Sequence, residues 1–413
     1  MHIVLFEDGG FVNLLPLAYW RAVFELRCGC GSLLDHVRAR YPNVGISLFV
    51  RGELRDVVAE RARLPVNAPP SDDDVLYLNG RVLLKEPLAD VIAPGARWVG
   101  DALLWARLRG PAARGLTAET LLDAATTRKV LADVPPAAAS ADAPALIAYP
   151  WDLVHRNAGM IVHAWRRLAD RGIVGKVDGG AHILEHSHVT IGRGSRIKPG
   201  AVLDAESGPI IIGENVTIQP NATVQGPCFI GDGSVVLTGV SVRGGSSIGP
   251  VCKIGGEIEG SILHGFSNKQ HDGFLGHAYV GEWVNLAADT INSDLKNTYG
   301  PVRVPINGVE VDSGQIFVGL TIGDHSKTGI GQLFPTGSVV GFGSSVATSG
   351  LAPKWVPSFR WLTDETNESY DVERCLNVAK IVMGRRDRTL SPAEETLFRR
   401  LPEIAKRYEG AAG

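Results

Sequence analysis

Apolar β-forming residues recur at every sixth position in the middle of the chain. The series runs without a gap through Ile212, Ile218, Val224, Ile230, Val236, Val242, Ile248 and Ile254. An amphipathic helix repeats at about 3.6 residues and a half-buried strand at about 2, so neither produces this period. A period of six is typical of a left-handed parallel β-helix, in which each hexapeptide forms one side of a triangular coil and points its aliphatic residue inward.

The same register extends in both directions from this block. It is present earlier at Ile191, Ile197 and Leu203, and it returns at Ile316, Ile322, Thr328, Phe334, Val340 and Val346. We therefore expect an all-β solenoid over residues 176–352. Within residues 260–305 only Val280 and Leu286 keep the register, and the composition turns polar. We expect this stretch to be a loop inserted at one edge, where solenoids often carry their binding surface.

The remaining segments predict an α/β domain before the solenoid and helices after it. Strand-like runs and a helix-like run indicate a compact α/β domain over residues 1–134. A Pro/Ala-rich linker is expected at 135–148, a connecting helix at 149–175, and a helical extension at 353–413. Ser391, Pro392 and Glu394 form a capping box with proline in the first helical position, which predicts a helix start.

Composition excludes several classes of protein. The chain has 413 residues, 45% hydrophobic and 21% charged, with a net charge of -3, so no strong field toward nucleic acid or an acidic membrane is expected. No apolar run approaches the ~20 residues of a membrane span, and the acidic start is unlike a secretory signal. Five cysteines, an odd number, fit a reducing cytoplasm. Cys28 and Cys30 predict a tight glycine turn, with a metal site as the alternative.

Within the polar stretch, one motif carries chemistry. The run His271-Asp272-Gly273-Phe274-Leu275-Gly276 is followed by Val280-Gly281 and Ala287-Ala288-Asp289-Thr290. It resembles the acetyltransferase half of the bifunctional UDP-N-acetylglucosamine pyrophosphorylase and glucosamine-1-phosphate N-acetyltransferase family. Phe274 stands where that family usually has tyrosine. The resemblance implies acyl transfer from acetyl-coenzyme A with His271 as general base, because an imidazole accepts a proton near neutral pH.

Further roles are expected around this histidine. Lys269, Phe274, Lys296, Asn297 and Tyr299 are candidates to hold a sugar phosphate or to polarise the thioester carbonyl, with a solvated basic turn as the alternative. Lys327, Thr328 and Gly319 are candidates to contact coenzyme A, with a simple corner turn as the alternative.

The N-terminal half shows a second resemblance. Residues 5–8, 14–17, 21–29, 77–81 and 149–152 look like a shortened sugar-nucleotidyltransferase domain of the kind fused to such solenoids in some bacteria. The resemblance implies that Arg21, Arg27 and Asn79 contact a nucleotide. It also implies that Asp8 or Asp152 holds Mg²⁺. The alternative is a degenerate domain that binds a nucleotide-sugar or merely packs on the solenoid.

Together these features predict a cytoplasmic transferase of sugar-nucleotide metabolism. The substrates expected are a sugar phosphate or a nucleotide-sugar, with a nucleoside triphosphate for the N-terminal domain. No nucleic acid and no membrane partner is expected, and flat solenoid sides favour a homotrimer. The rival hypothesis is a non-catalytic nucleotide-sugar scaffold with degenerate sites.

Overall fold

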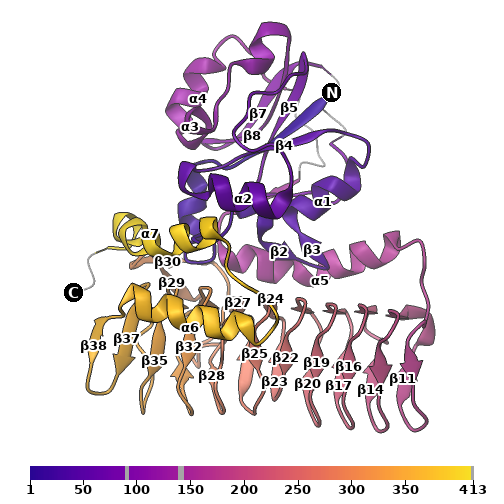
Figure 1. Cartoon of the computed structure of the whole chain (residues 1–413). Coiled ribbons are helices and arrows are strands. Elements are labelled where there is room, and N and C mark those ends of the chain that lie inside the picture. Colours follow the sequence, from indigo (N-terminus) through magenta and orange to yellow (C-terminus); the bar gives the residue numbers. More distant parts are fainter. Residues whose placement is uncertain (89–92, 138–143, 411–413) are drawn as a thin grey trace.

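The computed structural model describes residues 1–88, 93–137 and 144–410. An α/β domain stands on one side of a long β-solenoid, and the C-terminal helices join the two parts (Figure 1). The central residues of the expected linker, 138–143, lie outside the described residues. The fold class expected from the sequence is confirmed: an α/β domain, a left-handed parallel β-helix and C-terminal helices.

The α/β domain is built on a mixed sheet of five strands in the order β4-β1-β5-β8-β7. Strands β1 (His2–Phe6), β4 (Ile46–Phe49) and β5 (Asp74–Asn79) are parallel, whereas β7 (Gly95–Val99) and β8 (Ala102–Arg109) are antiparallel. Helices cover the sheet on both faces: α1 (Leu33–Arg40) and α2 (Arg55–Ala62) on one, α3 (Ala118–Leu122) and α4 (Ala124–Val130) on the other. Alternate residues of β1 therefore enter two different cores, as a doubly covered sheet requires.

The solenoid has three flat sides, each a stack of parallel strands. Face 1 consists of β12 (Val189–Ile191), β15 (Ile210–Ile212), β18 (Cys228–Ile230), β21 (Ser246–Ile248), β24 (Ile262–Gly265), β27 (Tyr279–Glu282), β31 (Thr321–Ile322), β34 (Val339–Val340) and β36 (Trp355–Val356).

Face 2 consists of β10 (Lys176–Val177), β13 (Arg196–Ile197), β16 (Thr217–Ile218), β19 (Val235–Val236), β22 (Lys253–Ile254) and β25 (Asn268–Lys269), then β32 (Lys327–Thr328), β35 (Ser345–Ala347) and β37 (Arg360–Thr363). Strand β38 (Asn367–Ser369) ends this face and runs antiparallel to β37.

Face 3 consists of β11 (His182–Leu184), β14 (Val202–Asp204), β17 (Thr223–Gln225), β20 (Ser241–Val242), β23 (Glu257–Glu259) and β26 (Phe274–Gly276), followed by β28 (Ile291–Asn292) and β33 (Leu333–Phe334).

The six-residue register fills the interior as predicted. Ile212 pairs with Ile230, and Ile230 with Ile248, so residues eighteen apart lie above one another. All eight members of the central series are buried. The expectation for Ile316 is wrong, since 45% of its side chain is exposed and the register resumes only with the buried Leu320 and Ile322.

The segment that leaves the coil is shorter than residues 260–305. Strands β24, β25, β26, β27 and β28 continue the three faces through residue 292. The chain then departs and forms an antiparallel hairpin, β29 (Arg303–Ile306) and β30 (Val309–Asp312), which packs its valines against Trp151 and Val339. The register of these coils could not be recognised in the sequence, because a polar residue such as Lys269 occupies an interior position that is aliphatic in other coils.

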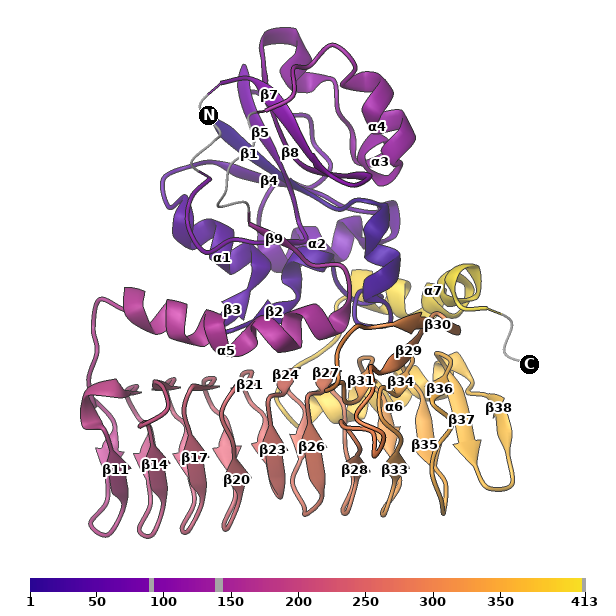
Figure 2. The same ribbon diagram turned by 180° about the vertical axis from the view of Figure 1, so that it is seen from behind.

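Three helices set the relation between the parts. Helix α5 (Pro150–Arg167) lies along face 1 beneath the α/β domain, and α6 (Val372–Gly384) lies across face 2 (Figures 1 and 2). Helix α7 (Pro392–Tyr408) begins at the predicted capping box and turns back to the α/β domain, where Glu394 pairs with Arg61 at 2.9 Å. In Figure 2 no helix lies in front of face 3.

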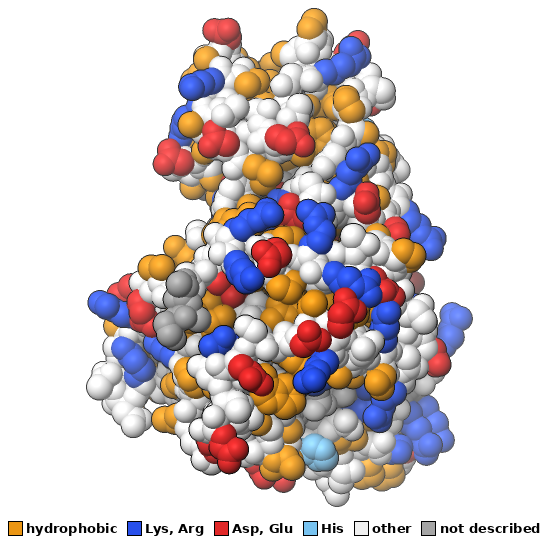
Figure 3. Space-filling view, turned by 60° about the vertical axis from the view of Figure 1, so that its left-hand side comes forward, with side chains coloured by type: hydrophobic (Ala, Val, Ile, Leu, Met, Phe, Trp, Pro, Cys, Tyr) orange, Lys and Arg blue, Asp and Glu red, His pale blue; other side chains and the backbone are white. Residues whose placement is uncertain are grey.

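One short hairpin of the α/β domain adds to the contact between the parts. Strands β2 (Arg27–Cys28) and β3 (Gly31–Ser32) form the glycine turn predicted for Cys28 and Cys30 and reach down to α5. Strands β6 (Val82–Leu83) and β9 (Ala145–Leu146) form a separate antiparallel pair. The space-filling view shows the α/β domain as a narrower lobe and charges of both signs mixed over the surface (Figure 3). None of the described helices is long and apolar enough to cross a membrane.

Candidate functional site

His271 lies at the corner between β25 and β26, where face 2 turns into face 3, and its side chain is exposed. The Lys269 side chain points into the solenoid and stabilises this corner by hydrogen bonds. Its side chain has no exposed surface, and its ammonium group donates to the backbone carbonyls of His271 and of Asp272, the latter at 2.7 Å. Burial lowers the pKa of Lys269 to about 8. The structure therefore places Lys269 behind the corner, where it shapes the turn and has no surface to offer a substrate.

The opposite corner of the same strand carries a second histidine. His277 Nδ1 lies 2.8 Å from Asp294 Oδ2, and its ring stacks on Phe317 with the centroids 5.0 Å apart. Phe274 is half-buried on face 3 between the two corners. The pair was missed in the sequence, although residues 277 and 294 are almost one coil apart. That spacing is the signal that stacks side chains at one corner of a triangular solenoid.

The other expected substrate residues follow this second corner. Asn292 binds both backbone polar groups of Gly276, which places the chain from Lys296 to Tyr299 just beyond the His277–Asp294 pair. Asn297 and Tyr299 are exposed, and the Lys296 ammonium donates to the carbonyl of Pro301. His271 and these residues therefore lie at opposite corners of face 3 within one chain.

Of the three residues expected to meet coenzyme A, one lines a cavity. Lys327 borders a cavity of about 370 Å³ between face 2 and the end of α6. Thr328 points into the solenoid, where its hydroxyl accepts from the Ala287 amide and lies 2.8 Å from Thr290 Oγ1. Gly319 packs against the carbonyl of Gly276, where any Cβ would clash, so its role is to allow close approach of the chains.

A crevice opens in the α/β domain at the carboxyl ends of β1 and β5. It has a volume of about 220 Å³ and is lined by Asp8, Gly9, Gly10 and Arg81, among others. Asn79 is the last residue of β5 and Arg81 lies just after it, and both donate to Asp8, with Asn79 Nδ2 at 2.9 Å and Arg81 Nη2 at 2.6 Å from Oδ2. Open α/β sheets often bind ligands outside the carboxyl ends of their parallel strands, which is where this crevice lies.

The two carboxylates expected to hold Mg²⁺ are each engaged by the protein. Asp8 accepts from Arg81, from Asn79 and from the Gly10 amide, whereas Asp152 caps α5 by accepting from the amides of Ala148 and Tyr149. Within the described ranges, no group of three or more His, Cys, Asp or Glu side chains is arranged to hold a metal ion. Since each carboxylate already accepts hydrogen bonds from the chain, neither Asp8 nor Asp152 fits the magnesium role that the resemblance implies.

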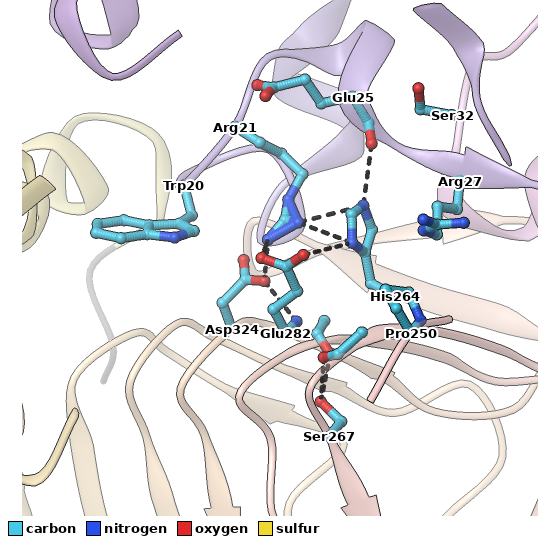
Figure 4. A network of polar contacts seen from close by, with 12 residues as sticks. Trp20, Arg21, Glu25, Arg27, Ser32, Pro250, His264, Ser267, Glu282 and Asp324 are labelled. Atoms are coloured by element: carbon cyan, nitrogen blue, oxygen red, sulfur yellow. Dashed lines mark hydrogen bonds and ion pairs between the residues drawn. The ribbon is translucent and has the colours of Figure 1, made fainter. Parts of the chain in front are cut away.

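Arg21 lies in the junction between the two parts and not in the crevice. Its guanidinium is buried and forms ion pairs with Asp324 and, at 3.2 Å, with Glu282, both from the solenoid (Figure 4). Its Nη1 also lies 3.1 Å from His264 Nδ1. His264 in turn lies 3.1 Å from Glu282 Oε1 and 3.0 Å from the carbonyl of Glu25 in the α/β domain.

Burial in this junction shifts the pKa values of its ionisable side chains. Burial and the neighbouring Arg21 lower the pKa of His264 to about 4, so the ring is neutral at pH 7. Burial alone would raise the pKa of Glu282, but Arg21 holds it below its ordinary value. Both terminal nitrogens of the guanidinium contact solenoid residues and so join the two domains. Glu282 follows His264 by one coil, so the solenoid period explains how these two side chains stack.

Arg27 also lies at the junction, beside a cavity. Its amide donates to the Tyr279 hydroxyl at 2.8 Å, and its side chain borders a polar cavity of about 290 Å³ at the junction, with Arg38, Arg61 and Glu282. Asn79 is buried behind the crevice, where it donates to Asp8, whereas Arg21 and Arg27 lie at the junction. The structure does not bring the three expected nucleotide contacts together.

Fold and sites define a class: a protein that joins a domain of the sugar-nucleotidyltransferase type to a hexapeptide-repeat β-helix. A family model described as sugar nucleotidyl transferase matches residues 3–171. The match covers the α/β domain and α5, and it confirms the resemblance inferred from the motifs.

Relatives among well-described proteins are similar over part of the chain. The bifunctional protein GlmU of Rippkaea orientalis is 31% identical over 135 residues, covering 31% of this chain and 28% of that protein. GlmU of Methanococcus aeolicus is 30% identical over 208 residues, covering 50% of this chain and 43% of that protein. The chain thus spans less than half the length of the relatives it matches.

Solved structures give only weak likenesses. The UDP-N-acetylglucosamine acyltransferase of Francisella novicida has a TM-score of 0.21 and 15% identity, covering 54% of this chain and 76% of that chain. AntD, an N-acyltransferase from Bacillus cereus, has a TM-score of 0.18 and 12% identity, covering 52% of this chain and 91% of that chain.

Proposed function

We propose that the protein is a transferase of sugar-nucleotide metabolism whose solenoid transfers an acyl group, most simply acetyl, from acyl-coenzyme A to a sugar. The acceptor is an amino or hydroxyl group of a sugar phosphate or a nucleotide-sugar. The observation that carries the proposal is the exposed His271 at a solenoid corner, in a motif that resembles that of the acetyltransferase family. The first 171 residues of the same chain include the match to a sugar nucleotidyl transferase.

The chemistry assigns a defined step to His271. Its imidazole removes the proton from the acceptor nitrogen or oxygen as that atom attacks the thioester carbonyl. The C–S bond then breaks, the acyl group stays on the acceptor, and the coenzyme leaves as a thiol that takes up the proton. Lys269 acts as a positioning residue, because its two hydrogen bonds to carbonyl groups fix the turn that presents the imidazole.

Face 3 is the surface proposed for the sugar. It joins the His271 corner to the His277–Asp294 corner, Phe274 lies between them, and no helix covers it in Figure 2. Lys296, Asn297 and Tyr299 stand at its far end. In a trimer, face 3 of one subunit lies against a neighbour, so that His271 of one subunit and the segment around Lys296 of the next can meet across one groove. We therefore propose a homotrimer in the cytoplasm.

The α/β domain is proposed to bind a nucleoside triphosphate or a nucleotide-sugar in the crevice above β1 and β5. The Gly9–Gly10 backbone and Arg81 line that crevice. The Arg81 guanidinium packs against Gly10 and supplies the positive charge of the lining. A sugar-1-phosphate nucleotidyltransfer in this domain is the second part of the proposal.

One experiment separates these activities. The purified chain is incubated with a panel of sugar phosphates and nucleotide-sugars, nucleoside triphosphates, Mg²⁺ and acetyl-coenzyme A, while free thiol and pyrophosphate are followed separately. Thiol release that depends on an acceptor supports acyl transfer, and pyrophosphate release supports nucleotidyltransfer. Binding of nucleotide-sugars with neither product would instead favour a non-catalytic scaffold.

A further inference from the structure

The cavity between face 2 and α6 has an unusual charge balance. Four of its lining residues are cationic: Lys253, Lys327, Arg385 and Arg386. The others are the amides Asn268, Gln270 and Asn285, the aromatics Phe266 and Trp283, and two valines. No Asp or Glu is among the described residues that line it. The cavity measures about 370 Å³, which is within the range of small-molecule sites.

The coil register builds the floor of this cavity. Lys253 pairs with Asn268, Asn268 bridges to Asn285, and Asn285 bridges to Lys327, so these residues occupy the same outward position in four successive coils. Neighbouring strands lie about 4.8 Å apart, so the two lysines stand roughly 14 Å apart along the solenoid, with two amides between them. This is a polar row long enough for more than one anionic group.

The roof comes from the end of α6. Arg386 donates to Asn268 Oδ1 at 2.9 Å, which fixes the helix end over the row, and Arg385 is exposed at the mouth. The side chains of Lys253 and Arg385 form no salt bridge with any described residue. The Lys327 ammonium donates to the His325 carbonyl at 2.9 Å, and burial lowers its pKa. Converging cations without a carboxylate repel one another, and a bound anion relieves that repulsion.

One wall is aromatic and built from corner residues. Phe266 and Trp283 hold the same corner in consecutive coils at positive φ, 52° and 60°, and their rings stack with centroids 4.4 Å apart. Non-glycine residues adopt this backbone only at an energetic cost, so the stack is maintained against a local preference. Amides and aromatic edges beside cations suit the organic part of a phosphorylated ligand.

We propose that this cavity binds a ligand that carries two or more phosphate groups, of the kind presented by a nucleoside diphosphate or by coenzyme A. The phosphates lie along the row from Lys253 to Lys327 under Arg385 and Arg386. Gln270 belongs to both the cavity and the corner that presents His271, so the ligand lies beside that corner. The proposal concerns binding and does not rest on the proposed transfer activity.

The test measures binding to the full chain by titration calorimetry at low and moderate salt. The probes are inorganic pyrophosphate, ADP, dephospho-coenzyme A and coenzyme A. The pocket variant is Lys253→Gln with Arg385→Gln. The matched control is Arg374→Gln, which removes one exposed charge from the first turn of the same helix, away from the cavity. We expect the pocket variant to bind at least about tenfold more weakly and the control to bind as wild type.

A second readout locates the ligand. Pyrophosphate should slow acetylation of Lys253 by acetic anhydride, followed by mass spectrometry, and should leave the exposed Lys380 of α6 unchanged. Tighter binding of coenzyme A than of ADP would identify the coenzyme, and the reverse order would identify a free nucleotide. The proposal is overturned if none of the probes binds at about 1 mM. It is overturned equally if they bind wild type and pocket variant alike, since the ligand would then occupy another site, such as the crevice beside Asp8.

Discussion

At the scale of single residues, the proposed site depends on one exposed side chain and one buried one. The sequence predicts a role for His271 because its motif is local. The inward direction of the Lys269 side chain could not be predicted, because only the coil register shows that its position belongs to the interior. The sequence alone does not show whether a lysine in a polar run faces solvent or donates to backbone carbonyls.

Replacing His271 by alanine is expected to remove acyl transfer. The general base contributes roughly 10² to 10⁴ in rate, so acceptor-dependent thiol release should fall by that factor in kcat/KM. Stability should change by less than about 0.5 kcal/mol because the side chain is exposed. His186→Ala, at an exposed histidine near the first coil, is the control. Unchanged thiol release in the His271 variant would contradict the proposed mechanism.

Lys269→Met distinguishes positioning from substrate binding. Methionine has similar length and lacks the donor, so the carbonyls of His271 and Asp272 lose their partner and the corner loosens. We expect kcat to fall about tenfold or more while KM for the acceptor stays the same. A raised KM with an unchanged kcat would show instead that the ammonium group holds the substrate.

At the scale of elements, the stacked coils share one continuous apolar interior. The six-residue period was sufficient to predict this interior and its three sides. It was insufficient for residues 260–292, where coils continue with polar residues facing out and a lysine facing in. The antiparallel hairpin β29–β30 and its packing on Trp151 are tertiary features without a local pattern.

Ile230→Ala is expected to destabilise the solenoid strongly. Ile230 is fully buried between Ile212 and Ile248, and a large-to-small change in a core costs about 2 to 5 kcal/mol. The measurement is the free energy of unfolding in urea, followed by circular dichroism. Ile330→Ala is the control, because 79% of the Ile330 side chain is exposed and little change is expected. Equal losses in both variants would contradict the inward register.

At the scale of the whole molecule, the junction around Arg21 is the feature that the sequence concealed most completely. The resemblance of residues 21–29 to a nucleotide-binding segment implied a phosphate contact for Arg21. Its actual partners, His264, Glu282 and Asp324, lie more than 240 residues later in the chain. No pattern in the sequence of the α/β domain indicates them. Asn79 and Asp8, by contrast, follow runs that were predicted as strands, and the structure brings the two side chains into hydrogen-bond contact.

His264 in the junction favours a loss of stability in acid, and the buried Asp324, whose pKa is raised to about 6, opposes it. The folded-state pKa of His264 is lowered to about 4 from an ordinary 6.5, so the unfolded chain binds more protons between these values. Stability should therefore decrease as pH falls from 6.5 to 4, by about 3 kcal/mol from this group alone. Urea unfolding at pH 7 and pH 4.5 measures it, and His264→Asn should show a smaller difference than wild type. An identical pH dependence in wild type and variant would exclude the ring as the source.

The proposed trimer is tested by sedimentation velocity. We expect a species with three times the mass of one chain, and Arg243→Glu on face 3 should shift it toward monomer by reversing a charge beside Glu257 and Glu259. A monomer at all concentrations would remove the groove between subunits and with it the shared acyl-transfer site.

The burial of the Arg21 guanidinium between the two parts affects any attempt to express each part alone. The α/β domain expressed alone would carry an arginine without its two carboxylates, and a solenoid alone would leave Glu282 and Asp324 without their cation. Uncompensated charge of this kind costs several kcal/mol when it stays buried. Separate expression of the halves should therefore yield poorly soluble or rearranged pieces, and each half is better studied by inactivating the other in the intact chain.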